Sequence, residues 1–166
     1  MAIKIKRTGH LVLKVKDLER SRRFFTEVLG LPVVGEAPQA GFLFFSPDVK
    51  ANHHVLAIRQ APEGARAPEP NDIGMEHVAY ELESFADLQE AYRIFKANNV
   101  RFRHVVFHGI TKSIYFYDPD GNMLEVYCNV PPDEYKKSVK NPYGLYGDIT
   151  AELEGKEPQR EGTVAP

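Results

Sequence analysis

Apolar residues recur along this chain in two patterns, one of period two and one of helical period. Short alternating runs, typical of half-buried strands, surround two longer runs whose apolar residues lie three or four positions apart. One strand opens at His10 and another at His77, each just before a helical run. The other strands are expected at 33–36, 41–46, 53–59, 102–108, 113–118 and 122–128.

Both predicted helices carry start and stop signals. Asp17 can cap the first helix, and Gly30 follows its last apolar residue. Ser84 can cap the second, with Asp87 three residues later in an arrangement that resembles a capping box. The asparagine pair at 98–99 is a plausible end for this second helix.

The order of elements after His10 is repeated after His77, and such a repeat determines the architecture. We expect an α+β fold in which two βαβββ modules, about 8–60 and 73–128, form one open barrel. Residues 1–128 would then be a single domain, with a linker rich in proline at 60–72. The turn sequence Asp118-Pro-Asp-Gly-Asn122 predicts a hairpin between the last two strands.

Residues 129–166 are expected to form a C-terminal extension. Its first part, to about 147, has enough apolar side chains to pack on a surface, namely Tyr135, Tyr143, Leu145 and Tyr146. From about 148 the chain is polar, and we expect that end to be flexible.

Composition places the chain among ordinary globular proteins. It has 166 residues, 43% hydrophobic and 27% charged, with a formal net charge of −2. That charge argues against a nucleic-acid partner, and no apolar run is long enough to cross a membrane. One cysteine, Cys128, excludes an internal disulfide and fits a cytoplasmic location, as does the lack of a visible signal peptide.

Three side chains are candidates for a metal site. Because strand residues alternate between faces, His10, His77 and Glu125 each lie opposite the more apolar face of their strand. Two imidazoles and one carboxylate on the concave side would form a facial triad, the ligand set of non-haem Fe(II) oxygenases. Three protein ligands leave positions open for substrate and oxygen. The simpler interpretation for any one of these histidines is a solvated or hydrogen-bonded residue.

The segment His108-Gly-Ile-Thr-Lys-Ser-Ile-Tyr115-Phe-Tyr-Asp-Pro-Asp-Gly-Asn122-Met-Leu-Glu125 resembles the signature of type I extradiol dioxygenases. That signature combines a histidine, a tyrosine, Asp-Pro-x-Gly-Asn and a metal-binding glutamate. His54-Val-Leu-Ala57 is similar to a second motif of these enzymes. Over about 8–128 the chain therefore resembles the vicinal oxygen chelate superfamily, which includes glyoxalase I, bleomycin- and fosfomycin-resistance proteins and these dioxygenases. It resembles their minority single-domain form.

The resemblance implies a reaction and roles for its residues. It implies an extradiol dioxygenase that opens a catechol-type aromatic diol with O2, using Fe(II), or Mn(II), held by His10, His77 and Glu125. His54 or His108 would take part in proton transfer, and Tyr115 would hydrogen-bond a substrate oxygen. A small aromatic diol and O2 would be the partners, and we expect a homo-oligomer.

Two other functions stay open. One is a metal-dependent lyase or isomerase of glyoxalase type, whose relatives typically add a fourth acidic or amide ligand on the fourth strand. That strand has no such residue here, although His53 or His54 could itself coordinate. The other is a non-catalytic binding protein like the bleomycin-resistance proteins.

Overall fold

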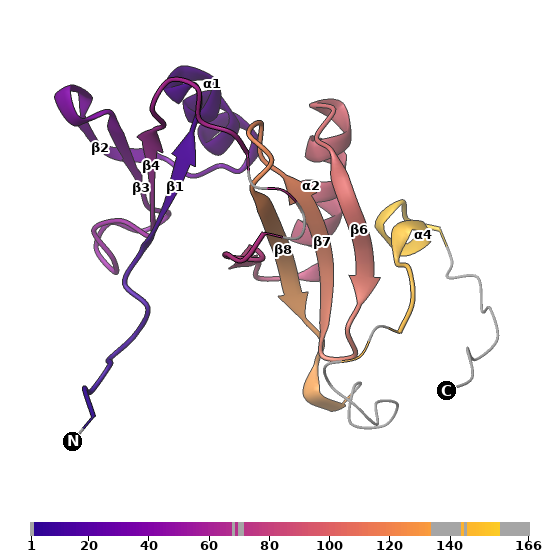
Figure 1. Ribbon diagram of the computed structural model, residues 1–166. Coiled ribbons are helices and arrows are strands. Elements are labelled where there is room, and N and C mark those ends of the chain that lie inside the picture. Colours follow the sequence, from indigo (N-terminus) through magenta and orange to yellow (C-terminus); the bar gives the residue numbers. More distant parts are fainter. Residues whose placement is uncertain (1, 68, 70–71, 134–143, 145, 157–166) are drawn as a thin grey trace. The chain divides into compact units, whose positions relative to one another are not determined.

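The computed structural model describes residues 2–67, 69, 72–133, 144 and 146–156 (Figure 1). These divide into two compact units. The first contains the residues before 73 together with Asp118–Asn122, and the second contains Ile73–Tyr117 and the residues after 122. Each unit has one four-stranded mixed sheet, and neither sheet closes on itself. The predicted fold class, α+β with two βαβββ modules, is confirmed.

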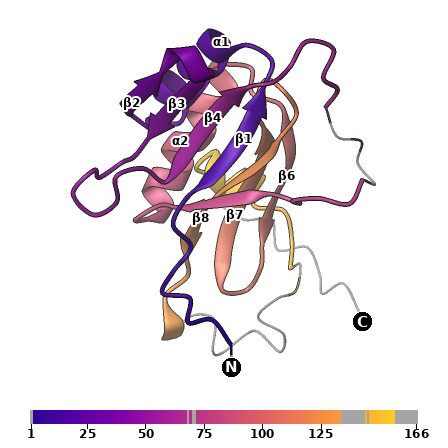
Figure 2. The same ribbon diagram turned by 60° about the vertical axis from the view of Figure 1, so that its left-hand side comes forward.

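The first unit has the strand order β1-β4-β3-β2. Strand β1 pairs with β4 in parallel, and the other neighbours are antiparallel (Figure 2). Its elements are β1 (Leu11–Val15), α1 (Leu18–Arg23), the π-helical turn η1 (Phe24–Val28), β2 (Val33–Ala37), the 3-10 turn η2 (Pro38–Ala40), β3 (Phe42–Phe45) and β4 (Leu56–Gln60).

The second unit repeats this topology with the order β5-β8-β7-β6. Strand β5 pairs with β8 in parallel, and β7 and β8 form the predicted hairpin. Its elements are β5 (Val78–Glu81), α2 (Phe85–Ala97), β6 (Phe102–Phe107), β7 (Thr111–Tyr117), β8 (Met123–Asn129) and α4 (Thr150–Leu153). None of the helices in the described part of the chain is long and apolar enough to span a membrane.

Both helices begin at the predicted caps. The Asp17 carboxylate accepts a hydrogen bond from the Arg20 backbone N–H at 2.9 Å, and the Ser84 hydroxyl accepts one from the Asp87 N–H at 3.2 Å. Helix α2 ends as predicted, with Asn99 in the left-handed region at φ 53°. Each cap satisfies a backbone N–H that has no partner within the helix.

The first helical run differs from a regular helix. The N–H of Leu29 bonds to the carbonyl of Phe24, five residues back, so the chain makes a π turn over Phe24–Val28. The wider turn directs the adjacent Phe24 and Phe25 both toward the interior, where they are 8% and 0% exposed. Burying two neighbouring phenylalanines is the physical reason for the departure from the α-helical repeat.

Strand β4 begins later than predicted, at Leu56 rather than at 53. Its partner β3 ends at Phe45, which pairs with Leu56, and the next N–H, that of Ser46, bonds to the carbonyl of Pro32 instead. His53 and His54 therefore lie in the loop that leads into β4.

The part of the C-terminal extension at 146–156 contains a short helix where its polarity predicted a flexible end. Helix α4 lies at Thr150–Leu153, and both Ile149 and Leu153 are 2% exposed. Two buried apolar side chains one helical turn apart are enough to dock this short helix, which contacts α2. Tyr135, Tyr143 and Leu145 lie outside the described residues.

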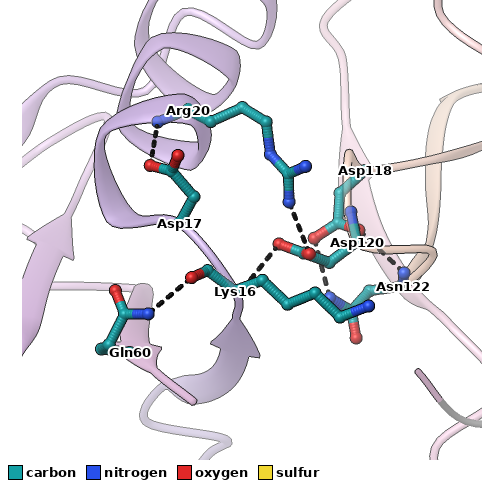
Figure 3. A network of polar contacts seen from close by, with 7 residues as sticks. All are labelled: Lys16, Asp17, Arg20, Gln60, Asp118, Asp120 and Asn122. Carbon is teal, nitrogen blue, oxygen red and sulfur yellow. Dashed lines mark hydrogen bonds and ion pairs between the residues drawn. The ribbon is translucent and has the colours of Figure 1, made fainter. Parts of the chain in front are cut away.

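A polar network holds the β7–β8 turn to the start of α1 (Figure 3). The Asp120 carboxylate accepts the Lys16 backbone N–H at 3.1 Å and an Arg20 guanidinium N–H at 2.5 Å. Asp118 accepts hydrogen bonds from the backbone N–H groups of Asp120 and Asn122, which shape the turn. This turn therefore belongs to the first unit, although the strands on both sides of it belong to the second.

Candidate active site

Four strands of the second unit contribute to one row of side chains across the sheet. The register aligns Ala79 of β5 with Glu125 of β8, Glu125 with Tyr115 of β7, and Tyr115 with His104 of β6. Residues directly opposite one another in neighbouring strands point to the same face, so these four side chains share it. His77, two positions before Ala79, lies at the edge of the same face.

His77 and Glu125 form a polar pair on this face. The His77 Nε2 atom lies 3.1 Å from the Glu125 Oε2 atom, and Glu125 is 6% exposed. No Lys or Arg side chain pairs with this carboxylate in the described part of the chain. His77 compensates this charge only when it is protonated, so beside a neutral His77 imidazole the buried carboxylate favours binding of a cation.

The pair has the spacing of two ligands of one metal ion. Two ligand atoms, each about 2.1 Å from an ion and at right angles to each other, are about 3.0 Å apart. The observed separation of 3.1 Å fits that requirement. The nitrogen and oxygen donors are those that Fe(II) and Mn(II) accept. Among the described residues, no three His, Cys, Asp or Glu side chains have the arrangement needed to hold one metal ion.

Tyr115 and His108 form a hydrogen-bonded pair beside these ligands. The Tyr115 hydroxyl lies 3.1 Å from the His108 Nε2 atom, and the Tyr115 ring packs edge-on against the His77 ring at 5.2 Å. Burial raises the pKa of the Tyr115 hydroxyl, and the nearby charge of Glu125 raises it further. Tyr115 is therefore a neutral hydrogen-bond donor at neutral pH.

The C-terminal extension fixes the orientation of His108. The other ring nitrogen, Nδ1, lies 3.1 Å from the Gly144 carbonyl, and Phe107 exchanges backbone hydrogen bonds with 146–147. Because the Gly144 carbonyl can only accept, Nδ1 carries the proton, and Nε2 accepts the hydrogen bond of the Tyr115 hydroxyl. Sequence patterns gave no sign that the extension reaches this site.

His104 is a residue of this face that the sequence analysis missed. Its ring centroid lies 4.5 Å from that of Tyr115, and the two residues are register partners. Its pKa is lowered by burial first and by the positive charge of Arg103 next. The strand expected at 102–108 already contained it, so the alternation of β6 with β7 was the signal that could have identified it.

The first unit gathers its predicted site residues in a separate cluster. The His10 and His54 ring centroids are 4.4 Å apart, His53 lies 4.4 Å from His54, and Phe44 packs edge-on against His54 at 5.1 Å. Burial lowers the pKa of His54, and the charges of His10 and His53 lower it further. His10 immediately precedes β1 as His77 immediately precedes β5.

The two parallel strand pairs identify the counterpart of Glu125. In the second unit Glu125 is opposite Ala79, two residues after His77. In the first unit the residue opposite Val12, two residues after His10, is Ala57. A methyl side chain cannot bind a metal, so the position of a fourth ligand on β4 holds no donor.

Comparison with known proteins agrees with this fold. Residues 7–126 match the model of the Glyoxalase/Bleomycin resistance protein/Dioxygenase superfamily. Two similar curated proteins come from Rhodococcus globerulus. Biphenyl-2,3-diol 1,2-dioxygenase 2 is 32% identical over 82% of this chain and 71% of its own length. Biphenyl-2,3-diol 1,2-dioxygenase 3 is 34% identical over 72% of this chain and 62% of its own length.

A solved structure shares the same architecture. A glyoxalase/dioxygenase from Nostoc punctiforme superposes with a TM-score of 0.63 over 76% of this chain and 92% of its own, at 23% identity. At this identity the likeness concerns the fold alone. The family match, however, extends over most of the chain, from the residues before His10 to the one after Glu125. This chain therefore belongs to the Glyoxalase/Bleomycin resistance protein/Dioxygenase superfamily.

Proposed function

We propose that this protein is a metal-dependent extradiol dioxygenase that cleaves a catechol-type aromatic diol with O2. The observation that carries the proposal is the His77–Glu125 pair, which has the spacing of two metal ligands and lies beside the Tyr115–His108 hydrogen bond. Similarity to two biphenyl-diol dioxygenases at 32% and 34% identity supports the same reaction class.

The proposal assigns the metal to His10, His77 and Glu125, with Fe(II) as the metal and Mn(II) as the alternative. His10 is the third ligand because it occupies in the first module the position that His77 occupies in the second. A bound metal would supply a Lewis acid that lowers the pKa of a chelating diol and an open position for O2. Ala57 at the counterpart of Glu125 supports a site with three protein ligands.

The protein's own residues would move and hold protons. The His108 Nε2 atom would accept a proton through its hydrogen bond with the Tyr115 hydroxyl, since Nδ1 faces the Gly144 carbonyl. Tyr115, kept neutral by its raised pKa, would accept a hydrogen bond from a substrate hydroxyl while its own proton faces His108. His54 would provide a second base, because its lowered pKa leaves its imidazole neutral at neutral pH.

The experiment is aerobic and anaerobic incubation of iron-loaded protein with a panel of catechols. Ring cleavage is followed by oxygen uptake and by the yellow colour of a semialdehyde-type product. We expect product only with oxygen present. Turnover without oxygen would replace the proposal with a glyoxalase-type reaction, and tight binding of an aromatic ligand by protein that takes up no metal would indicate a binding protein.

Metal content tests the ligands separately. His10→Ala, His77→Ala and Glu125→Ala should each lose bound iron and activity together. Glu81→Gln is the matched control, because Glu81 lies in the neighbouring row of the same sheet face and accepts hydrogen bonds from Tyr127 and Asn129. Stoichiometric iron retained in any of the three alanine variants contradicts the assigned triad.

A further inference from the structure

One face of the first sheet carries two cations beside two stacked aromatic rings. Lys14 of β1 is the register partner of Arg59 of β4, and Arg59 is the partner of Phe42 of β3. The Arg59 guanidinium carbon lies 5.4 Å from the centre of the Phe42 ring, and the Phe42 and Phe44 rings are parallel at 5.9 Å. We call Lys14, Arg59, Phe42 and Phe44 the cationic strip.

The strip lies on the face of the sheet that is not covered by α1. Leu13 and Val15, which alternate with Lys14 along β1, are 3% and 1% exposed, whereas Val12 on the strip's face is 47% exposed. Helix α1 contacts β3 and β4. The apolar side chains therefore pack beneath the helix, and the strip lies on the opposite face, with Lys14 and Arg59 exposed.

The two cations lie directly opposite each other on β1 and β4. Strands in a sheet are about 4.8 Å apart, and like charges directly opposite each other are destabilising. Neither Lys14 nor Arg59 takes part in an ion pair among the described residues. Glu36, the one acid in the four strands of this sheet, all of them described, pairs with Arg22 of α1 on the other face. The uncompensated charge makes this position complementary to an anion.

The strip also lies in line with the proposed metal ligand. Along β1, His10 is followed on the same face by Val12 and then by Lys14, so Lys14 is about 13 Å from His10 along the strand. Val12 is opposite Ala57, and Ala57 is opposite Phe44. The face therefore changes from metal-ligating to apolar and aromatic, and then to cationic.

We propose that the substrate is an aromatic vicinal diol with a carboxylate substituent, whose ring packs against Phe44 and Phe42 and whose carboxylate lies between Lys14 and Arg59. This inference rests on the proposed function, because it takes the diol end to be at His10. It departs from the uncharged diols after which the two Rhodococcus relatives are named. A guanidinium and an ammonium together form charge-assisted hydrogen bonds to a carboxylate that a neutral substituent cannot replace.

The test compares two ligands that differ only in charge, 3,4-dihydroxyphenylacetate and its neutral amide. Binding to the full chain is measured by calorimetry without oxygen, with and without iron. We expect the carboxylate to bind at least about tenfold more tightly than the amide, with a preference that weakens as salt is added. Equal affinity for the two ligands overturns the inference.

Single substitutions test whether Arg59 and Lys14 cause the tighter binding of the carboxylate ligand. Arg59→Gln and Lys14→Gln should each reduce the ratio of carboxylate to amide affinity about tenfold, and Arg59→Lys should retain most of it. Arg66→Gln, which removes an exposed cation of the linker, is the matched control. A carboxylate preference that survives in both glutamine variants overturns the inference, even if one of them binds more weakly overall. Thermal unfolding confirms that each variant is folded.

Oxygen uptake separates this inference from the proposed function. Ring cleavage of both ligands at equal kcat/KM overturns the inference and leaves the dioxygenase reaction standing. A carboxylate preference that depends on Arg59, without oxygen uptake from any diol, supports the anion site and overturns the proposed reaction. Binding of a second copy of the chain to this face would appear as a dimer that Arg59→Gln dissociates, and that outcome also overturns the inference.

Discussion

Removing the charge of Asp120 should destabilise the protein measurably, because this carboxylate joins residues about a hundred positions apart. It accepts the Lys16 backbone N–H and an Arg20 guanidinium N–H, at 3.1 and 2.5 Å. Its side chain is 6% exposed, whereas that of Arg20 is 41% exposed. Asp120→Asn keeps the size of the side chain and its preference for turns, so the change isolates the charge.

The expected magnitude follows from these contacts. A hydrogen bond to a charged group contributes about 1.5–3 kcal/mol to the free energy of unfolding. Arg20 is more than a third exposed, so water can solvate its guanidinium when the bond is lost. The lower end of that energy range therefore applies to this pair. We expect a coupling free energy of about 1.5 kcal/mol between Asp120 and Arg20, well above the ~0.5 kcal/mol of most exposed ion pairs.

The assay is a double-mutant cycle. Urea unfolding is followed by circular dichroism for the natural sequence, Asp120→Asn, Arg20→Gln and the double variant. The control is Glu19→Gln, which breaks the pair of Arg22 with the 66% exposed Glu19 and should cost less than about 0.5 kcal/mol. A coupling energy for Asp120 and Arg20 no larger than this control would refute the argument that burial of the carboxylate makes the pair strong.

Three further predictions follow from single residues. His108→Ala should retain iron but lower kcat by about 10²–10⁴-fold if His108 moves a proton, and an unchanged kcat would remove it from the mechanism. Ser84→Ala should lower the free energy of unfolding by about 1 kcal/mol through loss of the α2 cap, measured by urea unfolding, with Thr8→Ala in the exposed segment before β1 as the control. Cys128, 1% exposed and with its pKa raised by burial, should react with a thiol reagent at least about a hundredfold more slowly in the folded than in the unfolded chain. Its rate in the folded protein should also begin to rise at a higher pH, and equal rates would show that the strand opens freely.

The sequence determined the order of elements because the signals are local. Apolar alternation identified the strands, Asp17 and Ser84 identified the helix starts, and the Asp118-Pro-Asp-Gly-Asn122 turn identified the β7–β8 hairpin. Each of these depends on residues within a few positions of one another. The pairing of Tyr115 with Glu125 is also a local feature, because both residues lie on the β7–β8 hairpin that the turn creates.

Tertiary structure decided the features that depend on pairing between distant segments. The register of β6 with β7 aligns His104 with Tyr115, and the parallel pairs β1–β4 and β5–β8 make Ala57 the counterpart of Glu125. The Gly144 carbonyl reaches His108 from the C-terminal extension.

No local pattern encodes such contacts, because a shift of one residue in register would send every side chain of a strand to the opposite face. The register of each strand pair is determined instead by the sheet as a whole, because only one register buries the apolar side chains of all its strands on the same face. His10, His77, Tyr115 and Glu125 could be proposed from strand alternation and from the family resemblance, but His104 could not be identified without the β6–β7 register. Their neighbours, and the cations that follow His10 along the first sheet, came only from the folded chain.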